Sequence, residues 1–151
     1  MTLARDLANT ANDKSIVQMV AVSYDVTKDY TTSTYVDTGL TATITPTSAS
    51  NKILVFVNLQ IGSRLGAGSA VKSRLLRDST TIVQLSTFGQ AYISTAMYGF
   101  VNAVYLDSPA TTSAVTYKTQ AANFLSQNYI STNEDLDGQA TSSILLMEVT
   151  P

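Results

Sequence analysis

The sequence of 151 residues contains no cysteine, no histidine and no tryptophan. Without cysteine, the chain can form no disulfide and no zinc-thiolate site, and it has no thiolate nucleophile. Without histidine, it lacks the commonest general base and a common ligand of transition metals. These absences exclude a Ser-His-Asp triad and a Cys-His pair within this chain.

Charged residues are also scarce. They make up 13% of the chain, against roughly 25% in a typical soluble domain, whereas serine and threonine are abundant. Nine lysines and arginines stand against eleven aspartates and glutamates, which gives a formal net charge of -2. The basic residues are scattered and form no footprint for the phosphates of a nucleic acid. We expect a surface of hydroxyl and amide groups and no nucleic-acid partner.

Long apolar runs are missing as well. No run approaches the roughly 20 residues that span a bilayer, and the N-terminal stretch "MTLARDLANTANDK" lacks the apolar region of a signal peptide. We therefore expect no membrane partner and synthesis in the cytosol without export by the Sec route. The length suits one domain with a single core.

The first 15 residues differ from the rest. Leu3 and Leu7 are four positions apart, which places them on one face of a short helix, and Arg5 lies between them. This pattern indicates an N-terminal arm, with a domain at 16–151. A frayed tail is the alternative, because the first residues of a domain stay disordered unless something holds them. An arm of this size can hardly order itself, so we expect it to dock on a neighbour.

From residue 16 the apolar residues follow a period of two, which is typical of β-strands. "LTATIT" at 40–45 alternates without a break and predicts a half-buried strand. "KILVFVNLQI" at 52–61 has one face that is apolar throughout and a second face that starts with Leu54 and Phe56 before it turns polar. We expect this strand near the middle of a sheet.

The remaining strands are predicted from similar patterns. They lie at 15–24, 70–77, 81–87, 97–107, 113–121, roughly 126–131 and 142–150. Short strands with turn clusters every 8 to 12 residues, and no convincing helix after the arm, predict an all-β fold, an antiparallel β-sandwich or barrel. The strand number suits a jelly-roll-like sandwich best.

Two residue types favour assembly without proving it. Threonine is frequent in the predicted strands and keeps a sheet face polar but uncharged, which suits contact with a neighbour. The eight tyrosines lie in or beside strands, and tyrosine is enriched in interfaces. A neutral soluble sandwich with tyrosines packed in its core explains the same composition.

The acidic cluster "NEDLDG" is a candidate calcium site. Asn133, Asp135, Asp137 and Gly138 match positions 1, 3, 5 and 6 of an EF-hand loop. Position 12, which should be a bidentate glutamate, is Ile144 within a predicted strand, and no helices flank the loop. The sequence therefore favours a solvated hairpin turn over a metal site.

Paired carboxylates for general acid-base chemistry are hard to find. The only glutamates are Glu134, in the acidic cluster, and Glu148, near the C-terminus. Asp107 precedes a serine and a proline and is explained by an Asx-type turn cap. The stretch "GAG" at 66–68 lacks the strand-to-helix context of a phosphate-binding loop. We predict no catalytic, cofactor-binding or metal-binding residues, and we expect that the protein is not an enzyme.

Four stretches in order resemble a known family. They are "TYVDTGLTATITPTSASNKILVFVNLQI", "RLLRDSTTI", "YLDSPATTSAVTYKTQ" and "SSILLMEV". Their order is similar to that in small β-structured domains of tailed-bacteriophage virion proteins, and the resemblance covers about residues 16 to 150. It implies a jelly-roll homotrimer, similar in style to the tumour-necrosis-factor and complement globular heads, that is located in the virion after synthesis in the host cytoplasm.

The resemblance leaves two functions open. Family members with a receptor-binding role sit on long fibre shafts, whereas this sequence has only a short arm, which favours a capsid decoration or cement protein. Its partners would be the major capsid protein or another virion structural protein, bound through Leu3, Arg5, Leu7, Ile16 and Val17. The alternative is a tail-fibre or tail-tip module whose loops "GSRLGAGS" and "TNEDLDG" bind a host receptor or glycan.

Overall fold

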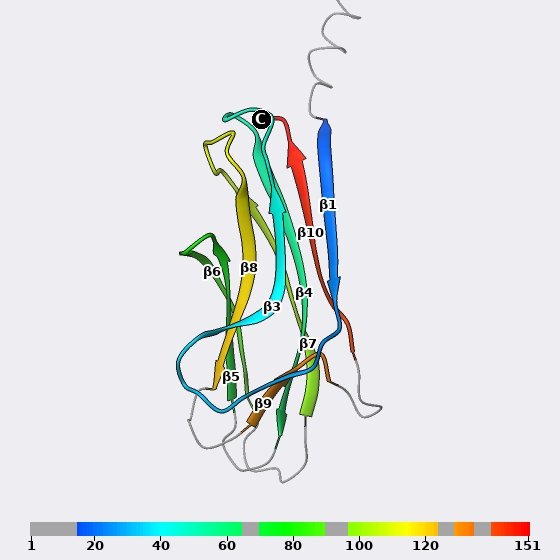
Figure 1. The fold of residues 1–151 in the computed structure, drawn as a ribbon, viewed down its shortest axis with the longest axis vertical. Coiled ribbons are helices and arrows are strands. Elements are labelled where there is room, and N and C mark those ends of the chain that lie inside the picture. Colours follow the sequence, from blue (N-terminus) through cyan, green and yellow to red (C-terminus); the bar gives the residue numbers. More distant parts are fainter. Residues whose placement is uncertain (1–14, 65–69, 90–96, 124–128, 135–139) are drawn as a thin grey trace, which may run out of the picture.

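Two antiparallel sheets pack face to face in the computed structural model, which describes residues 15–64, 70–89, 97–123, 129–134 and 140–151 (Figure 1). The strands within these ranges are β1 (Ile16–Tyr24), β2 (Lys28–Tyr30), β3 (Val36–Ile44), β4 (Lys52–Arg64), β5 (Ala70–Arg77), β6 (Thr80–Gly89), β7 (Met97–Asp107), β8 (Val115–Asn123), β9 (Tyr129–Thr132) and β10 (Ser142–Val149). No helix in the described part of the chain is long and apolar enough to cross a membrane.

The strand order defines a jelly roll. In the first sheet β1 pairs with β10, β10 with β4, and β4 with β7 on its other side. The far end of β4 also pairs with β9, which in turn pairs with the short β2. The second sheet has the order β3-β8-β5-β6. The eight long strands thus form two four-stranded layers in which the first strand lies beside the last, which confirms the predicted jelly-roll-like sandwich.

The strands lie close to their predicted positions, with two differences. β3 begins at Val36, before the alternating stretch, because the chain pairs with β8 on both sides of a bulge between Asp37 and Thr41. β2 was not predicted, since three residues are too few to show a period of two. The proposed strand at about 126–131 corresponds to β9, of which the structure describes Tyr129–Thr132.

The core lies between the two sheets and depends most on β4. The five inward side chains of β4 are at most 3% exposed: Ile53, Val55, Val57, Leu59 and Ile61. Apolar side chains from the second sheet pack against them, among them Leu40, Ile44, Leu75 and Tyr117. Each such burial contributes about 1.5 to 3 kcal/mol. The apolar face predicted for 52–61 is therefore the centre of the core.

A buried polar joint connects the two sheets at one end. The carboxylate of Asp107, at the end of β7, accepts hydrogen bonds from Arg77 Nη1 on β5 (2.8 and 3.0 Å) and from the hydroxyl of Tyr117 on β8 (2.7 Å). Asp107 is 6% exposed. Burial and this hydrogen bond to Asp107 raise the pKa of Tyr117. The prediction of an Asx-type turn cap for Asp107 is thus corrected: its carboxylate joins the sheets.

Replacing Tyr117 by phenylalanine should lower the free energy of unfolding by about 1.5 to 3 kcal/mol, because it removes one hydrogen bond to a buried carboxylate. Urea denaturation measures this difference. Tyr105→Phe on β7 is the matched control, since no hydrogen bond of the Tyr105 hydroxyl joins it to the described residues, and we expect it to change stability by less than about 0.5 kcal/mol. Equal stability of Y117F and Y105F would contradict the assignment of this joint.

Candidate interaction surface on the first sheet

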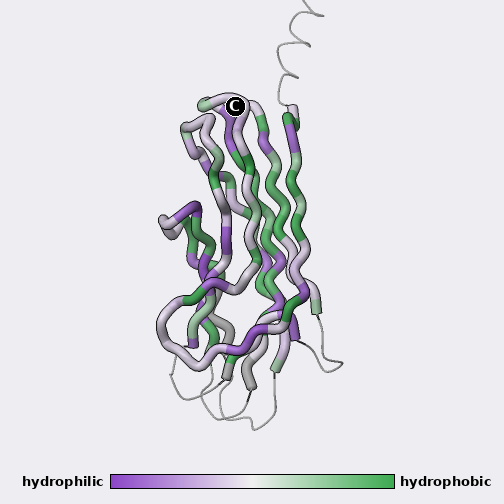
Figure 2. Tube along the Cα trace, in the orientation of Figure 1, coloured by the Kyte–Doolittle hydropathy of each residue, from purple (hydrophilic) through white to green (hydrophobic). Residues whose placement is uncertain are grey.

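The outward side of the first sheet carries two rows of apolar side chains across all four long strands. Cross-strand pairing aligns Met19, Met147, Leu54 and Leu106 in one row and Ala21, Leu145, Phe56 and Val104 in the next. We call these eight residues the apolar face. They occupy the positions between the inward residues, because successive side chains of a strand point to opposite sides of the sheet. The middle parts of β1 and β10 are therefore apolar on both sides, and Figure 2 shows them as hydrophobic stretches between more polar segments of each strand.

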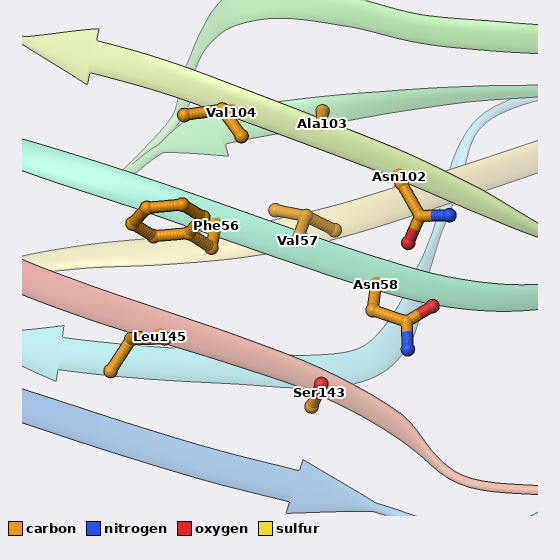
Figure 3. A pocket seen from close by; sticks show the side chains of 8 residues that line it. All are labelled: Phe56, Val57, Asn58, Asn102, Ala103, Val104, Ser143 and Leu145. Carbon is orange, nitrogen blue, oxygen red and sulfur yellow. The ribbon is translucent and has the colours of Figure 1, made fainter.

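A row of small polar residues borders the apolar face. Register places Ser23, Ser143, Asn58 and Asn102 side by side on the same four strands. Between the two kinds of rows lies an open depression of about 440 Å³. Its lining residues, on β4, β7 and β10, are Phe56, Val57, Asn58, Asn102, Ala103, Val104, Ser143 and Leu145 (Figure 3). The buried Oδ1 of Asn58 accepts no hydrogen bond within the described residues.

The two outer surfaces of the sandwich differ in charge. No residue in the three rows just described is charged. On the second sheet, Lys118 forms an ion pair with Asp37 (2.9 Å), and Gln120 donates a further hydrogen bond to Asp37 (2.7 Å). Partial burial raises the pKa of Asp37, but these hydrogen bonds outweigh it and hold the pKa below its usual value. The second sheet thus presents a charged surface, whereas the outward side of the first sheet is mainly apolar, with Lys52 at the start of β4 beside the apolar face.

On the charged surface of the second sheet, polar and charged side chains contact one another. The guanidinium of Arg74 lies 4.0 Å from the ring centre of Tyr35 and donates to the side-chain oxygen of Gln120 (2.6 Å). The hydroxyl of Tyr35 donates to Gln84 (3.1 Å), and Lys72 approaches the same ring at 5.0 Å. These mutual contacts point to a solvent-facing surface.

The predicted partner-binding residues fall partly within the structure. Ile16 and Val17 lie at the start of β1, next to the apolar face, and are 54% and 40% exposed. Ile16 also lines a second depression of about 310 Å³ together with Leu106. Leu3, Arg5 and Leu7 lie outside the described residues. The structure therefore connects the end of the predicted arm with the apolar face.

The acidic cluster is only partly described. Asn133 uses both atoms of its amide: Nδ2 donates to the carbonyl of Val26 (3.0 Å) and Oδ1 accepts from the hydroxyl of Ser142. The side chain of Gln60 bonds both the N–H and the carbonyl of Glu134. Asp135, Asp137 and Gly138 lie outside the described residues. In the part of the chain that is described, no group of three acidic residues lies close enough to hold a metal ion.

Glu148 has a role that the sequence did not reveal. Its side chain is fully buried on β10. One carboxylate oxygen accepts from the N–H and hydroxyl of Thr47 (both 2.8 Å) and from Nδ2 of Asn51 (2.7 Å), and the other accepts from Nε2 of Gln18 (2.6 Å). Burial raises the pKa of Glu148, but the hydrogen bonds outweigh this effect and lower it to about 2. The carboxylate thus fastens the β3–β4 loop and β1 to β10.

This pKa makes stability depend on pH. Because the pKa of Glu148 is lower in the folded chain than the ordinary value of 4.5, its contribution is complete above pH 4.5 and is lost as the pH falls toward 2. Glu148→Gln should be less stable at pH 7 by about 1 to 3 kcal/mol, because the amide cannot accept all four hydrogen bonds. Urea denaturation at pH 7, 4 and 3 should show that the difference between the two proteins shrinks with falling pH. A difference that stays constant would refute this account.

No protein-family model matches the chain, and no curated protein sequence matches it either. Solved structures with a similar course of the chain include a chain in the structure of the Gx strain of infectious bursal disease virus, with 9% sequence identity and a TM-score of 0.47 over 87% of this chain and 38% of that one. The VP2 subviral particle of infectious bursal disease virus is similar with 11% sequence identity and a TM-score of 0.43, over 89% of this chain and 33% of that one. Dimeric latent PorU from Porphyromonas gingivalis is similar with 12% sequence identity and a TM-score of 0.44, over 90% of this chain and 13% of that one.

The chain therefore spans well under half the length of each of these proteins. Because their TM-scores lie below 0.5, the fold assignment rests on the strand order of this chain.

Proposed function

We propose that this protein is a structural component of a virion, and specifically a trimeric decoration or cement protein that binds and stabilises the capsid lattice of a tailed bacteriophage. The observation that carries this proposal is the apolar face of the first sheet. Contiguous apolar patches on the surface of a soluble protein often mark sites of interaction with another protein. A jelly roll with such a surface suits permanent residence in an assembly.

The stretches that resemble phage virion proteins support the proposal, because they form the joints of this fold. "TPTSASN" and "LLMEV" meet where Thr47 and Asn51 donate hydrogen bonds to Glu148. "RLLRDSTTI" and "YLDSPATT" meet at the ion pair of Arg77 with Asp107 (2.8 Å). The resemblance thus concerns residues that determine how the jelly roll closes.

The proposal divides the work between two surfaces. Copies of the chain bury the apolar face, while the arm carries Leu3, Arg5 and Leu7 to the major capsid protein or another virion structural protein. Ile16 and Val17, exposed at the start of β1, continue the arm and take part in the same contact. The chain performs no catalytic step and needs no cofactor, and it joins the virion after synthesis in the host cytoplasm.

Deletion of residues 1–14 should abolish attachment to particles and leave the oligomer intact, because the arm supplies the main part of the capsid contact and the start of β1 only extends it. The measurement is co-sedimentation of the purified protein with particles assembled without it, together with native mass spectrometry of the free protein. A full-length variant with Ile16→Ser and Val17→Ser should attach at least about tenfold more weakly, since apolar contacts are lost at the edge of the same interface.

Bound protein should also raise the temperature at which the particles release their contents, because a cement protein binds the assembled lattice in preference to its parts. Undiminished attachment of the truncated protein would overturn the role of the arm. Failure of the full-length protein to bind particles, combined with binding to host cells or to a glycan array, would replace the proposal by a tail-tip module that recognises a receptor.

A further inference from the structure

The second depression lies on the outward side of the first sheet, at the end where β1 begins and β10 ends. We refer to it as the end depression. Its volume is about 310 Å³, and its lining residues are Ser15, Ile16, Lys52, Leu106, Val149, Thr150 and Pro151. Ligand pockets are mainly apolar and carry a few polar groups at fixed positions. The end depression has this composition, with apolar side chains, two hydroxyl groups and one ammonium group.

Hydrogen bonds between the two ends of the described chain hold the rim of the end depression. The N–H of Ser15 donates to the side-chain oxygen of Thr150 (2.9 Å), and the N–H of Thr150 donates to the carbonyl of Ser15 (3.1 Å). These bonds continue the ladder between β1 and β10, in which Ile16 pairs with Val149. Binding costs less when a site has its shape before the ligand arrives. The rim is thus formed in the free chain.

Two of the lining side chains are large, apolar and open to water. Ile16 is 54% exposed and Leu106 is 50% exposed. They belong to β1 and β7, the outer strands of the four, so the end depression crosses the width of the sheet. An apolar side chain placed between them would remove their surface from water, which is favourable in proportion to the area covered.

Lys52 is the one charged side chain among the described residues that line the end depression. The nearest acids by register are Asp107 and Glu148, which both pair with Ile53 and point with it to the inner side of the sheet. Each of them is occupied by its own donors there. Lys52 forms no ion pair with any described residue, Pro151 at the end of the chain included. Its positive charge is therefore not neutralised within the described chain.

We propose that the end depression binds an apolar side chain next to a carboxylate, supplied by an acidic segment of the virion protein that the arm contacts. The arm favours this occupant, because residues 1–14 join the sandwich at Ser15, which itself lines the end depression. A protein held by the arm therefore lies beside it. Lys52 selects acidic over neutral segments by charge complementarity. The occupant rests on the proposed function, whereas the preference for an apolar carboxylate does not.

Two test ligands separate the charge from the apolar contact. N-acetyl-leucine and N-acetyl-leucinamide share the side chain, and only the first has a carboxylate. Both should shift the methyl NMR signals of Ile16, Leu106 and Val149 in the purified full-length protein, with dissociation constants on the order of millimolar. The acid should bind about two- to fivefold more tightly than the amide, as one partly exposed ion pair allows.

Lys52→Met should remove the preference for the acid and leave binding of the amide unchanged. Lys72→Met is the matched control, because Lys72 is a partly exposed lysine of the second sheet that forms no ion pair with a described residue. Leu106→Ser should weaken both ligands by about threefold or more. Its control is Val26→Ser, which changes an apolar side chain of similar exposure (54%) outside the end depression. Circular dichroism shows whether each variant is folded.

Equal binding of acid and amide to the wild-type protein, or a preference that survives Lys52→Met, would overturn the inference. The absence of saturable shifts at the three methyl-bearing residues would do the same. Binding that appears only after Leu3→Ser and Leu7→Ser would also contradict it, because the chain's own arm would then be the occupant.

Co-sedimentation with particles tests the occupant separately. Lys52→Glu should attach at least about fivefold more weakly than Lys72→Glu, because the reversed charge repels an acidic segment. Undiminished attachment of Lys52→Glu contradicts the proposed occupant. Failure of the wild-type protein to attach contradicts the proposed function and the occupant with it. The ligand titrations use no particles, so they decide on the preference of the end depression in either case.

Discussion

The pleat of β4 is the constraint on which the rest of the structure depends. This strand lies between β10 and β7, and its alternate side chains point into the sandwich and away from it. The inward set, from Ile53 to Ile61, forms the core with the second sheet, while Leu54 and Phe56 point outward. Because both sets are apolar, this one strand stabilises the core and also contributes apolar side chains to the solvent-exposed surface of the sheet.

The sequence predicts the strands well because alternation is a local property. The pattern at 52–61 is sufficient to predict both β4 and its central position. The apolar face is different: it arises from residues on β1, β4, β7 and β10, and only the strand order brings these four strands together. The threonine-rich faces, which the composition associates with assembly, lie on the second sheet beside charged residues such as Lys118.

The hydrogen bonds of the two buried carboxylates could not be predicted either, because their partners are distant in the sequence. Glu148 and Thr47 are separated by 101 positions in the chain, and nothing in the local pattern of either residue indicates the other. The same is true of Asp107, whose sequence context predicted a turn cap and gave no sign of Arg77 and Tyr117 as its partners. A buried carboxylate is defined by the donors around it, and these donors come from distant strands. The predicted arm residues Leu3, Arg5 and Leu7 remain predictions.

The four hydrogen bonds to Glu148 have a consequence for local opening of the fold. Their donors are Gln18 on β1 and Thr47 and Asn51 in the β3–β4 loop, so the carboxylate is satisfied only when these segments lie against β10. A buried charge that loses its partners is costly. The first strand, the loop and the last strand should therefore open to solvent together, as one cooperative unit.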